Sequence, residues 1–211
     1  MANTASGRVR VLTVTVSDLR KRHADEAGKR LDAELTLGGL PVVRPAVLAD
    51  EIPFIRELVR SAATNNEADA IVLTGGTGIN PRDQTQEALE GIYEKRIAGF
   101  GEAFRRLAFD ALGPRAMFFG ASAGIYNQCP IFSLPGNAQA IVLAARQLLV
   151  PVLVSAVEMA TGRETHTAGP TTVRPDRGSS GDVSSSLRPD TGSSRDVNVS
   201  VKPDAAPPSS K

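Results

Sequence analysis

The amino-acid sequence predicts a three-layer αβα sandwich, in which helices cover both faces of a mostly parallel sheet. Short apolar or β-branched runs alternate with helical patterns as far as about residue 160, an order typical of parallel sheets. Small residues follow several of the expected strands. Near residue 163 the sequence becomes rich in Ser, Pro, Gly and Asp. We therefore expect one domain over residues 1–162 and a separate tail over residues 163–211.

The expected strands are short and apolar. The run RVLTVTV, residues 10–16, has the β-branched composition of a buried strand. The segment 41–48 contains Pro41 and Pro45, which predicts a strand near the sheet edge because proline donates no backbone hydrogen bond. A further strand is expected over residues 69–73, and the segments 116–124 and 129–137 are each expected to be a strand followed by small residues.

The expected helices alternate with these strands. The pattern over residues 51–64 places Ile52, Ile55, Leu58 and Val59 on one helical face. The apolar stretch 138–160 is interrupted by polar residues and contains Pro151, which favours one or two packed helices with a kink over a membrane span. The other expected helices cover residues 27–37, 85–96 and 100–111.

The composition excludes several classes of function. The formal net charge is +1, whereas a general nucleic-acid or membrane-surface binder carries a basic excess. The first residues lack the apolar segment of a signal peptide. Cys129 is the only cysteine, and His23 and His166 are far apart, so neither a disulfide nor a His/Cys metal cluster is expected. We expect Cys129 to be a small buried side chain in a cytoplasmic protein.

The tail has too few large apolar residues to bury a core, which predicts disorder. RPDRGSSGDV at 174–183 recurs imperfectly as RPDTGSSRDV at 188–197, a spacing of 14 residues, with a partial third copy at 202–204. The repeat is interpreted as a solvated tail or as a segment that docks a partner.

The segment TGGTGINPRDQT, residues 74–85, lies between an expected strand and an expected helix. Its glycines permit positive φ and leave backbone N–H groups uncovered, and the following helix presents its positive end to an anion. Thr74 and Thr77 can add hydroxyl donors. No lysine follows the glycines, unlike the phosphate loop of nucleotide hydrolases. The segment therefore predicts either a phosphate site or a tight turn whose glycines only relieve strain.

Two aspartates have two interpretations each. Asp83 precedes a helical stretch with Gln86 three residues later, and Asp50 precedes the helix at 51–64, so both match helix N-caps, the first with a capping-box partner. Alternatively they act together, because Mg²⁺ prefers one or two carboxylates plus phosphate oxygens and neutralises charge in phosphoryl or nucleotidyl transfer. Three small-residue loops, at 74–78, 121–124 and 135–137, are expected along one sheet edge, where such folds bind ligands.

Five segments stand in an order that goes beyond a generic pattern. They are VTVSDLRKRHADEAGKRL near the start, VLADE at 47–51, IVLTGGTGINPRDQTQEAL at 71–89, GFGEAFRRLAF at 99–109 and SLPGNAQA at 133–140. Together, and most specifically through GGTG-x-x-x-RD-x-T with the later PGN, they resemble the MoaB/MogA family of molybdenum-cofactor biosynthesis proteins. The resemblance covers roughly residues 8–160.

The resemblance implies a three-layer α/β fold, a homotrimer or hexamer, and binding of molybdopterin. In active members the terminal phosphate of molybdopterin attacks the α-phosphate of ATP with Mg²⁺, pyrophosphate leaves, and adenylyl-molybdopterin passes to a molybdenum-insertion protein. It also implies that Asp83 is the catalytic carboxylate and that Asp50 helps hold Mg²⁺ and the ATP phosphates. The substrate-binding positions that match the family are Gly75, Gly76, Thr77, Gly78, Pro135, Gly136, Asn137, Ser17 and Asp18. The last two match an early Ser-Asp and can equally be a strand end and turn.

One departure bears on activity. Phe119 and Gly120 stand where the family often carries Ser-Arg, so affinity or rate falls if that arginine contacts a phosphate or the pterin. Ser122 is a candidate for a nearby hydroxyl. The departure favours a second hypothesis, a non-catalytic molybdopterin carrier or scaffold. A third is a nucleotide pyrophosphatase, but such relatives usually have a second domain, for which this chain is too short.

Overall fold

The computed structural model describes residues 9–17 and 25–163, which contain one six-stranded sheet in the order β2-β1-β3-β6-β5-β4. Three neighbouring strand pairs are parallel, and β5 is antiparallel to both of its neighbours. The strands are β1 (Val11–Val16), β2 (Ala46–Leu48), β3 (Ala70–Thr74), β4 (Lys95–Arg96), β5 (Ser122–Tyr126) and β6 (Cys129–Leu134). The helices are α1 (Glu26–Leu37), α2 (Ile52–Thr64), α3 (Thr85–Glu90), α4 (Ala98–Leu112), η2 (Pro114–Phe118), α5 (Ala138–Ala144), η3 (Ala145–Leu149) and α6 (Val150–Thr161).

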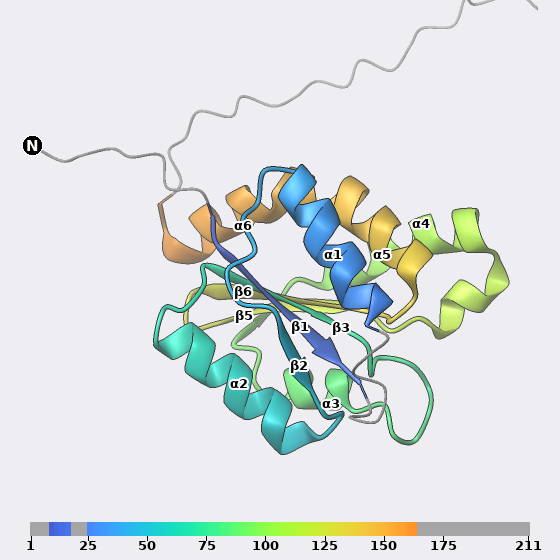
Figure 1. Ribbon diagram of the computed structural model, residues 1–211, viewed down its shortest axis with the longest axis horizontal. Coiled ribbons are helices and arrows are strands. Elements are labelled where there is room, and N and C mark those ends of the chain that lie inside the picture. The colour runs from blue at the N-terminus through green and yellow to red at the C-terminus, as the bar shows by residue number, and fades with distance from the viewer. Residues whose placement is uncertain (1–8, 18–24, 164–211) are drawn as a thin grey trace, which may run out of the picture. The chain divides into compact units, whose positions relative to one another are not determined.

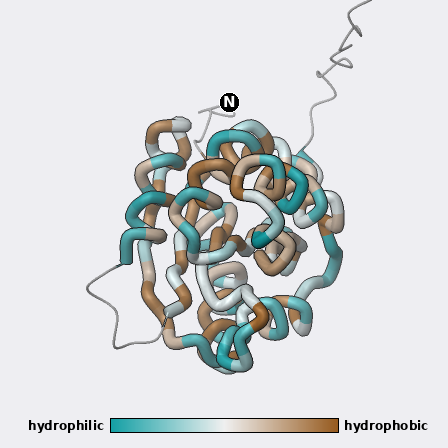
Figure 2. The backbone as a smooth tube through the Cα atoms, turned by 90° about the vertical axis from the view of Figure 1, so that its right-hand side faces the viewer, coloured by the Kyte–Doolittle hydropathy of each residue, from teal (hydrophilic) through white to brown (hydrophobic). Residues whose placement is uncertain are grey.

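Helices cover both faces of the sheet, as the sequence predicts (Figure 1). Helices α1, α4, α5 and α6 lie on one face, and α2 and α3 lie on the other. The central strands β1 and β3 are buried on both faces, which is why their sequences are continuous apolar or β-branched runs. Hydrophobic segments run through the middle of the domain, and hydrophilic segments gather on its outer turns (Figure 2). The three-layer αβα sandwich is therefore confirmed.

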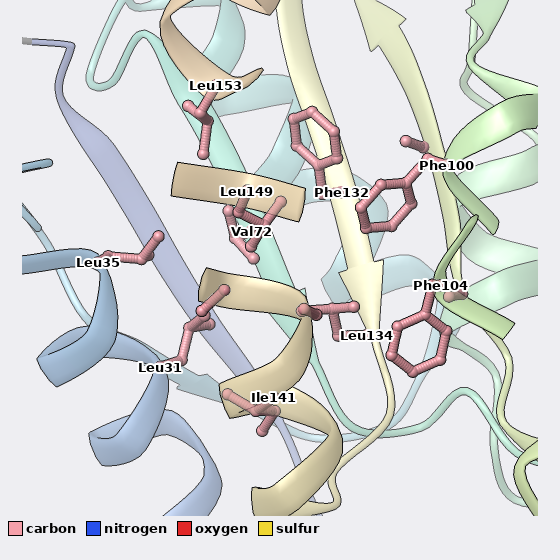
Figure 3. Close-up of a cluster of buried hydrophobic side chains, with 14 of the residues drawn as sticks. Leu31, Leu35, Val72, Phe100, Phe104, Phe132, Leu134, Ile141, Leu149 and Leu153 are labelled. Carbon is pink, nitrogen blue, oxygen red and sulfur yellow. The ribbon is translucent and has the colours of Figure 1, made fainter. Parts of the chain in front are cut away.

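The larger core lies between the sheet and the four-helix layer (Figure 3). Side chains from α1, α4 and the C-terminal helix meet Val72 of β3 and Phe132 of β6. The rings of Phe100 and Phe132 meet edge to face, with 5.0 Å between their centroids, an arrangement that aromatic pairs favour. The second core, under α2 and α3, contains Ile55 and Val59, as the helical pattern predicts. The two cores fix the sheet that carries the loops at its edge.

Two expected elements have different limits. The helix expected over 85–96 ends at Glu90, because Gly91 follows and the Arg56 guanidinium bonds the carbonyl of Ala88 at 3.0 Å; residues 95 and 96 instead form β4. The segment 116–124 is expected to start as a strand and end as a small-residue loop, but β5 begins only at Ser122, within the expected loop. Its first part is a 3₁₀ turn, because Gly113 at φ +80° ends α4 and Pro114 starts a new turn.

The edge strand β2 is shorter than expected. Only Ala46–Leu48 pairs continuously with β1, and Val42 adds an isolated bridge. Pro41 and Pro45 lack the N–H groups that a longer ladder needs. The predicted edge position is correct, since β2 is the first strand of the sheet.

The C-terminal helical stretch, Ala138–Thr161, is long and apolar enough to span a membrane by length and composition. Its inner side chains, including Ile141, Leu149 and Leu153, are fully buried in the larger core, which is how a packed helix behaves. A π-helical turn, Ala145–Leu149, precedes Pro151. That wider turn accommodates a residue without an N–H group, so α5, η3 and α6 form one continuous helical stretch.

Candidate functional site

Three loops meet at the edge where the parallel strands end. The glycine turn, defined here as Gly75–Gly78, follows β3. The 135–137 loop follows β6, and the Thr74 hydroxyl donates a 3.1 Å hydrogen bond to the Pro135 carbonyl. The segment at 121 and 122 reaches the same edge because β5 runs antiparallel and begins there, with Ser122 opposite Ser133. The structure therefore brings the three predicted segments together. The segment at 121 and 122 takes part as the start of strand β5, not as a loop.

The glycine turn is shaped by positive φ angles and close backbone contacts. Gly75 has φ +95° and Gly76 has φ +61°, values that favour glycine. A Cβ on Gly75 would overlap the Val16 carbonyl of β1. The Gly75 N–H donates to the Leu134 carbonyl at 3.0 Å, so the turn is fixed to strands on both sides of β3.

Several donor groups in the turn have no protein partner among the described residues. The Thr77 hydroxyl is buried, in a residue that is 4% exposed, and has no hydrogen-bond partner in the described part of the chain. Within residues 9–17 and 25–163, the N–H groups of Gly76, Thr77 and Gly78 also donate to no protein group. Buried polar groups normally have partners. A phosphate would supply acceptors to all of these donors.

Both aspartates face the turn, and neither caps a helix. The N-cap of α2 is Glu51 and that of α3 is Gln84, and neither side chain makes a capping bond. The cap interpretation, including the Asp83–Gln86 capping box, is therefore wrong. Asp50 Oδ1 instead accepts the Gln84 N–H at 2.9 Å, and Asp83 Oδ2 accepts the Asn80 N–H at 3.3 Å.

The carboxylates lie against glycine Cα atoms of the turn. A Cβ on Gly76 would overlap the Asp50 carboxylate, and one on Gly78 would lie 2.6 Å from Asp83 Oδ2. Burial raises the pKa of Asp50, the nearby charges of Asp83 and Glu87 raise it further, and the Gln84 N–H opposes both. A cation between the carboxylates would relieve this repulsion.

The donor set suits a magnesium ion that is shared with a ligand. A hollow of about 330 Å³ beside the turn is lined by Gly78, Asp83 and Glu87. The described residues contain no group of three or more His, Cys, Asp or Glu side chains that could hold a metal alone. Mg²⁺ commonly takes one or two carboxylates and completes its shell with water and phosphate oxygens. Asp83 offers such a carboxylate at the hollow, whereas Asp50 stands outside the residues that line it.

Other predicted residues are used differently. The side-chain Oδ1 of Asn137 accepts the Ala140 N–H at 3.0 Å and caps α5. The Ser122 hydroxyl bonds the Tyr93 hydroxyl at 3.0 Å and the Ser133 hydroxyl at 2.9 Å. Asp18 lies outside the described residues.

Ser17 and Gly136 stand at the same edge. Ser17 follows β1, and its N–H donates to the Leu48 carbonyl at 2.9 Å. A Cβ on Gly136 would lie 3.5 Å from the Gly75 Cα. A pocket role for Ser17, Asp18, Ser122, Pro135, Gly136 and Asn137 stays a prediction.

Thr85 and Glu87 also lie at the site, and the sequence did not predict a role for either residue. The Thr85 hydroxyl donates to the Gly75 carbonyl at 2.9 Å, and its N–H donates to the Gly76 carbonyl at 2.8 Å. The signal for Thr85 was present, since it ends the RD-x-T motif. Glu87 stands four residues after Asp83, and only the fold shows that both line one hollow.

The surroundings of Gly120 explain in part why Phe119-Gly120 replaces the Ser-Arg pair that the family often carries. A Cβ at Gly120 would overlap the Thr77 carbonyl, so in this conformation no side chain, and no arginine, can stand there. The segment before β5 packs on the backbone of the glycine turn as a result. The glycine at position 120 and the shape of the glycine turn therefore depend on each other.

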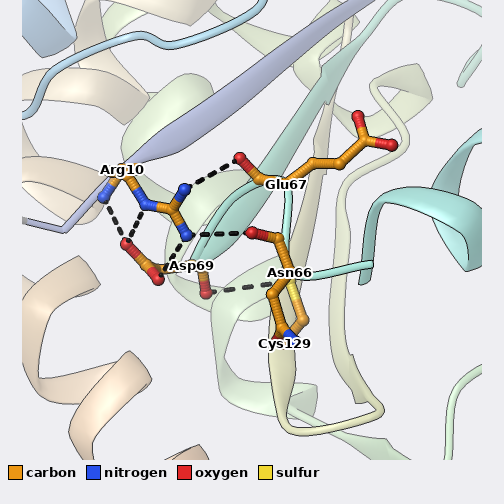
Figure 4. Close-up of polar contacts among 5 residues, drawn as sticks. All are labelled: Arg10, Asn66, Glu67, Asp69 and Cys129. Carbon is orange, nitrogen blue, oxygen red and sulfur yellow. Dashed lines mark hydrogen bonds and ion pairs between the residues drawn. The ribbon is translucent and has the colours of Figure 1, made fainter. Parts of the chain in front are cut away.

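A larger hollow, of about 760 Å³, lies at the opposite sheet edge, away from the turn. There the Arg10 guanidinium donates to the Asp69 carboxylate and to the Asn66 and Glu67 carbonyls (Figure 4). Cys129 lines it and is 5% exposed. Burial raises the pKa of its thiol to about 12, so the thiol stays protonated and unreactive. The expectation of a small buried cysteine is confirmed.

Gly120→Ala tests the contact with the turn. We expect the added methyl group to lower the free energy of unfolding by about 1–3 kcal/mol, because backbone must move. The matched control is Gly99→Ala, because a Cβ there meets nothing within 4 Å; it should change that free energy by less than about 1 kcal/mol. Urea unfolding measures both, and equal effects would contradict the contact.

Asp50→Asn tests the raised pKa. The folded protein binds this proton more tightly than the unfolded chain, so the ionised carboxylate lowers stability above the raised pKa. Asparagine keeps an oxygen for the Gln84 N–H and removes the charge. We expect the variant to be more stable than wild type at neutral pH, with the difference shrinking as the pH falls through the raised pKa.

Urea unfolding over a pH series measures this difference, with Asp110→Asn, an exposed carboxylate on α4, as the matched control. A gain in stability that is independent of pH, or equal in the control, would contradict the assignment.

Known sequences and structures match the same region. Residues 10–155 match the family described as "Probable molybdopterin binding domain". Molybdenum cofactor biosynthesis protein B of Bacillus subtilis (strain 168) is 35% identical over 150 residues, which cover 71% of this chain and 88% of that protein. The protein of the same name from Escherichia coli (strain K12) is 32% identical over 144 residues, 68% of this chain and 85% of that protein.

The fold agrees as well. A crystal structure of a molybdenum cofactor biosynthesis protein B superposes with a TM-score of 0.71 at 32% identity, covering 76% of this chain and all of that one. A molybdopterin biosynthesis enzyme MoaB from a Thermus species gives a TM-score of 0.66 at 29% identity, covering 73% of this chain and 97% of that one. Because the match covers more than half of its residues, the chain belongs to the MoaB/MogA family of probable molybdopterin-binding domains.

Proposed function

We propose that the protein works in molybdenum cofactor biosynthesis as a molybdopterin adenylyltransferase that uses ATP and Mg²⁺. The observation that carries this proposal is the buried Thr77 hydroxyl, which has no partner among residues 9–17 and 25–163, in a turn flanked by two carboxylates that cap no helix. A bound phosphate would give these donors their acceptors, and a bound divalent cation would offset the negative charge of the carboxylates. The names of the relatives place them in molybdenum cofactor biosynthesis.

The reaction needs no nucleophile from the protein. A terminal phosphate oxygen of molybdopterin forms a bond to the α-phosphorus of ATP, and the bond from that phosphorus to the bridging oxygen breaks. Pyrophosphate leaves with the electron pair. Mg²⁺ would supply charge neutralisation on the phosphates. The protein's part is to hold the phosphates in line through the turn and to place Asp50 and Asp83 beside them.

One observation favours a second candidate function, a molybdopterin carrier or scaffold. Gly120 cannot carry a side chain without overlapping the Thr77 carbonyl, so the arginine that the family often has at this position is absent. A carrier would keep the phosphate donors of the turn. It would have little use for two carboxylates held beside them at a cost in charge repulsion, which supports the enzyme.

Asp83→Ala discriminates between these functions. We expect it to lower the rate of adenylyl-molybdopterin and pyrophosphate formation by at least about 100-fold, because a charged group beside the transferring phosphate is lost. Molybdopterin affinity should change little. The matched control, Asp110→Ala on the exposed side of α4, should keep both properties.

A time course with purified protein, molybdopterin, ATP and Mg²⁺ measures this. Turnover by Asp83→Ala at the wild-type rate would refute the role of Asp83. Tight molybdopterin binding with no product from wild type would favour the carrier.

Self-association into a trimer or hexamer is part of the proposal. Phe109, Met117 and Phe118, on α4 and η2, are each at least half exposed, and such apolar clusters often mark interfaces. We expect light scattering to give three or six times the mass of the 22.2 kDa chain. A mass of one chain at micromolar concentration would contradict it. Location in the cytoplasm and transfer of product to a molybdenum-insertion protein complete the proposal.

A further inference from the structure

A side-chain network lies beneath the glycine turn, on the α2–α3 side of the sheet. It comprises Gln86 of α3, Tyr93, Ser122 of β5 and Ser133 of β6. Gln86 Nε2 donates to Ser133 Oγ at 3.0 Å, Ser133 Oγ bonds Ser122 Oγ at 2.9 Å, and Ser122 Oγ bonds the Tyr93 hydroxyl at 3.0 Å. The Ser122 N–H also donates to Ser133 Oγ at 3.1 Å. These hydrogen bonds, with one from Ser133 Oγ to the Ser122 carbonyl at 3.3 Å, join α3, β5, β6 and Tyr93.

Burial makes this network fixed in geometry and in protonation. Ser133 is fully buried in the sheet, and bonds in a low-dielectric interior are stronger than in water. Burial also raises the pKa of Tyr93, so its hydroxyl keeps its proton throughout the physiological range. Gln86 is the network's connection to α3.

Three successive residues at the start of α3 form hydrogen bonds to three different segments of the chain. The Gln84 N–H bonds the Asp50 carboxylate, and Thr85 bonds the carbonyls of Gly75 and Gly76. Gln86 bonds Ser133. The first two contacts are with parts of the site, and only the third reaches the rigid sheet. Asp83 comes immediately before these residues, so its position depends on where the first turn of α3 is held.

We propose that Gln86 is a positioning residue, which anchors the first turn of α3 to Ser133 and so keeps Asp83 beside Gly78 for the transfer step. The inference rests on the proposed function for its kinetic part. A purely structural network would behave differently. Its loss would lower stability, but the folded fraction would keep its turnover number.

Gln86→Leu tests the anchor, because leucine is apolar and of similar size. We expect kcat to fall about 100-fold with little change in KM for ATP, since a displacement of about 1 Å can cost that much. Gln86→Glu should restore most of kcat, because its carboxylate can accept the Ser133 hydroxyl proton. Gln147→Leu, an exposed glutamine on η3, is the matched control and should resemble wild type.

Hydrogen exchange over residues 79–90 gives a readout that does not need turnover. We expect faster exchange of the Gln84 and Thr85 amides in Gln86→Leu than in wild type, Gln86→Glu or Gln147→Leu. Urea unfolding gives the folded fraction of each variant. Wild-type kcat or wild-type exchange in Gln86→Leu would overturn the inference, as would lower stability alone. If wild type itself forms no product, the proposed function fails, and the exchange comparison still decides whether Gln86 anchors α3.

Discussion

The turn after β3 has no room for a Cβ atom at three of its four positions, Gly75, Gly76 and Gly78, and the rest of the site depends on this constraint. Gly75 lies against the Val16 carbonyl, Gly76 against the Asp50 carboxylate and Gly78 against Asp83. Each contact brings a different part of the chain to the same turn. Replacing any of these glycines would push away one neighbour, so the turn and its surroundings have one shape. The result is a turn whose N–H groups and Thr77 hydroxyl have no partner in the described part of the chain.

The position of the carboxylates follows from the same packing. An aspartate just before a helix usually bonds the helix's own N–H groups, but Asp50 bonds Gln84 in another segment. This contact holds two loops together and leaves the second Asp50 oxygen at the turn. The ionised form is disfavoured there by burial and by Asp83 and Glu87. Such an arrangement lowers the stability of the domain, which is common where residues are placed for function.

The sequence predicts the layers of the fold well, because buried strands and amphipathic helices have distinct periodicities. It does not reveal that β5 is antiparallel. The turn between β5 and β6 is the pair Asn127-Gln128, both at positive φ. It makes a two-residue hairpin turn, but it lacks the glycine by which such turns are usually recognised in a sequence. The end of α3 was missed because Arg56, from another helix, bonds its last carbonyls. The capping box predicted between Asp83 and Gln86 does not form, because the Gln86 side chain bonds Ser133, which is remote in sequence. In each case a long-range contact outweighed a local pattern.

The order of the strands has a consequence for how the domain is made. The glycines and both aspartates lie within the first 85 residues, yet the Gly75 N–H bonds Leu134, and Thr74 bonds Pro135 across 61 positions. The β5–β6 hairpin is local and closes readily, whereas docking β6 on β3 closes a long loop, which is entropically costly and slow. During synthesis the chain therefore carries the whole glycine turn well before that turn has a shape. The turn acquires its shape only when β6 has left the ribosome and docked.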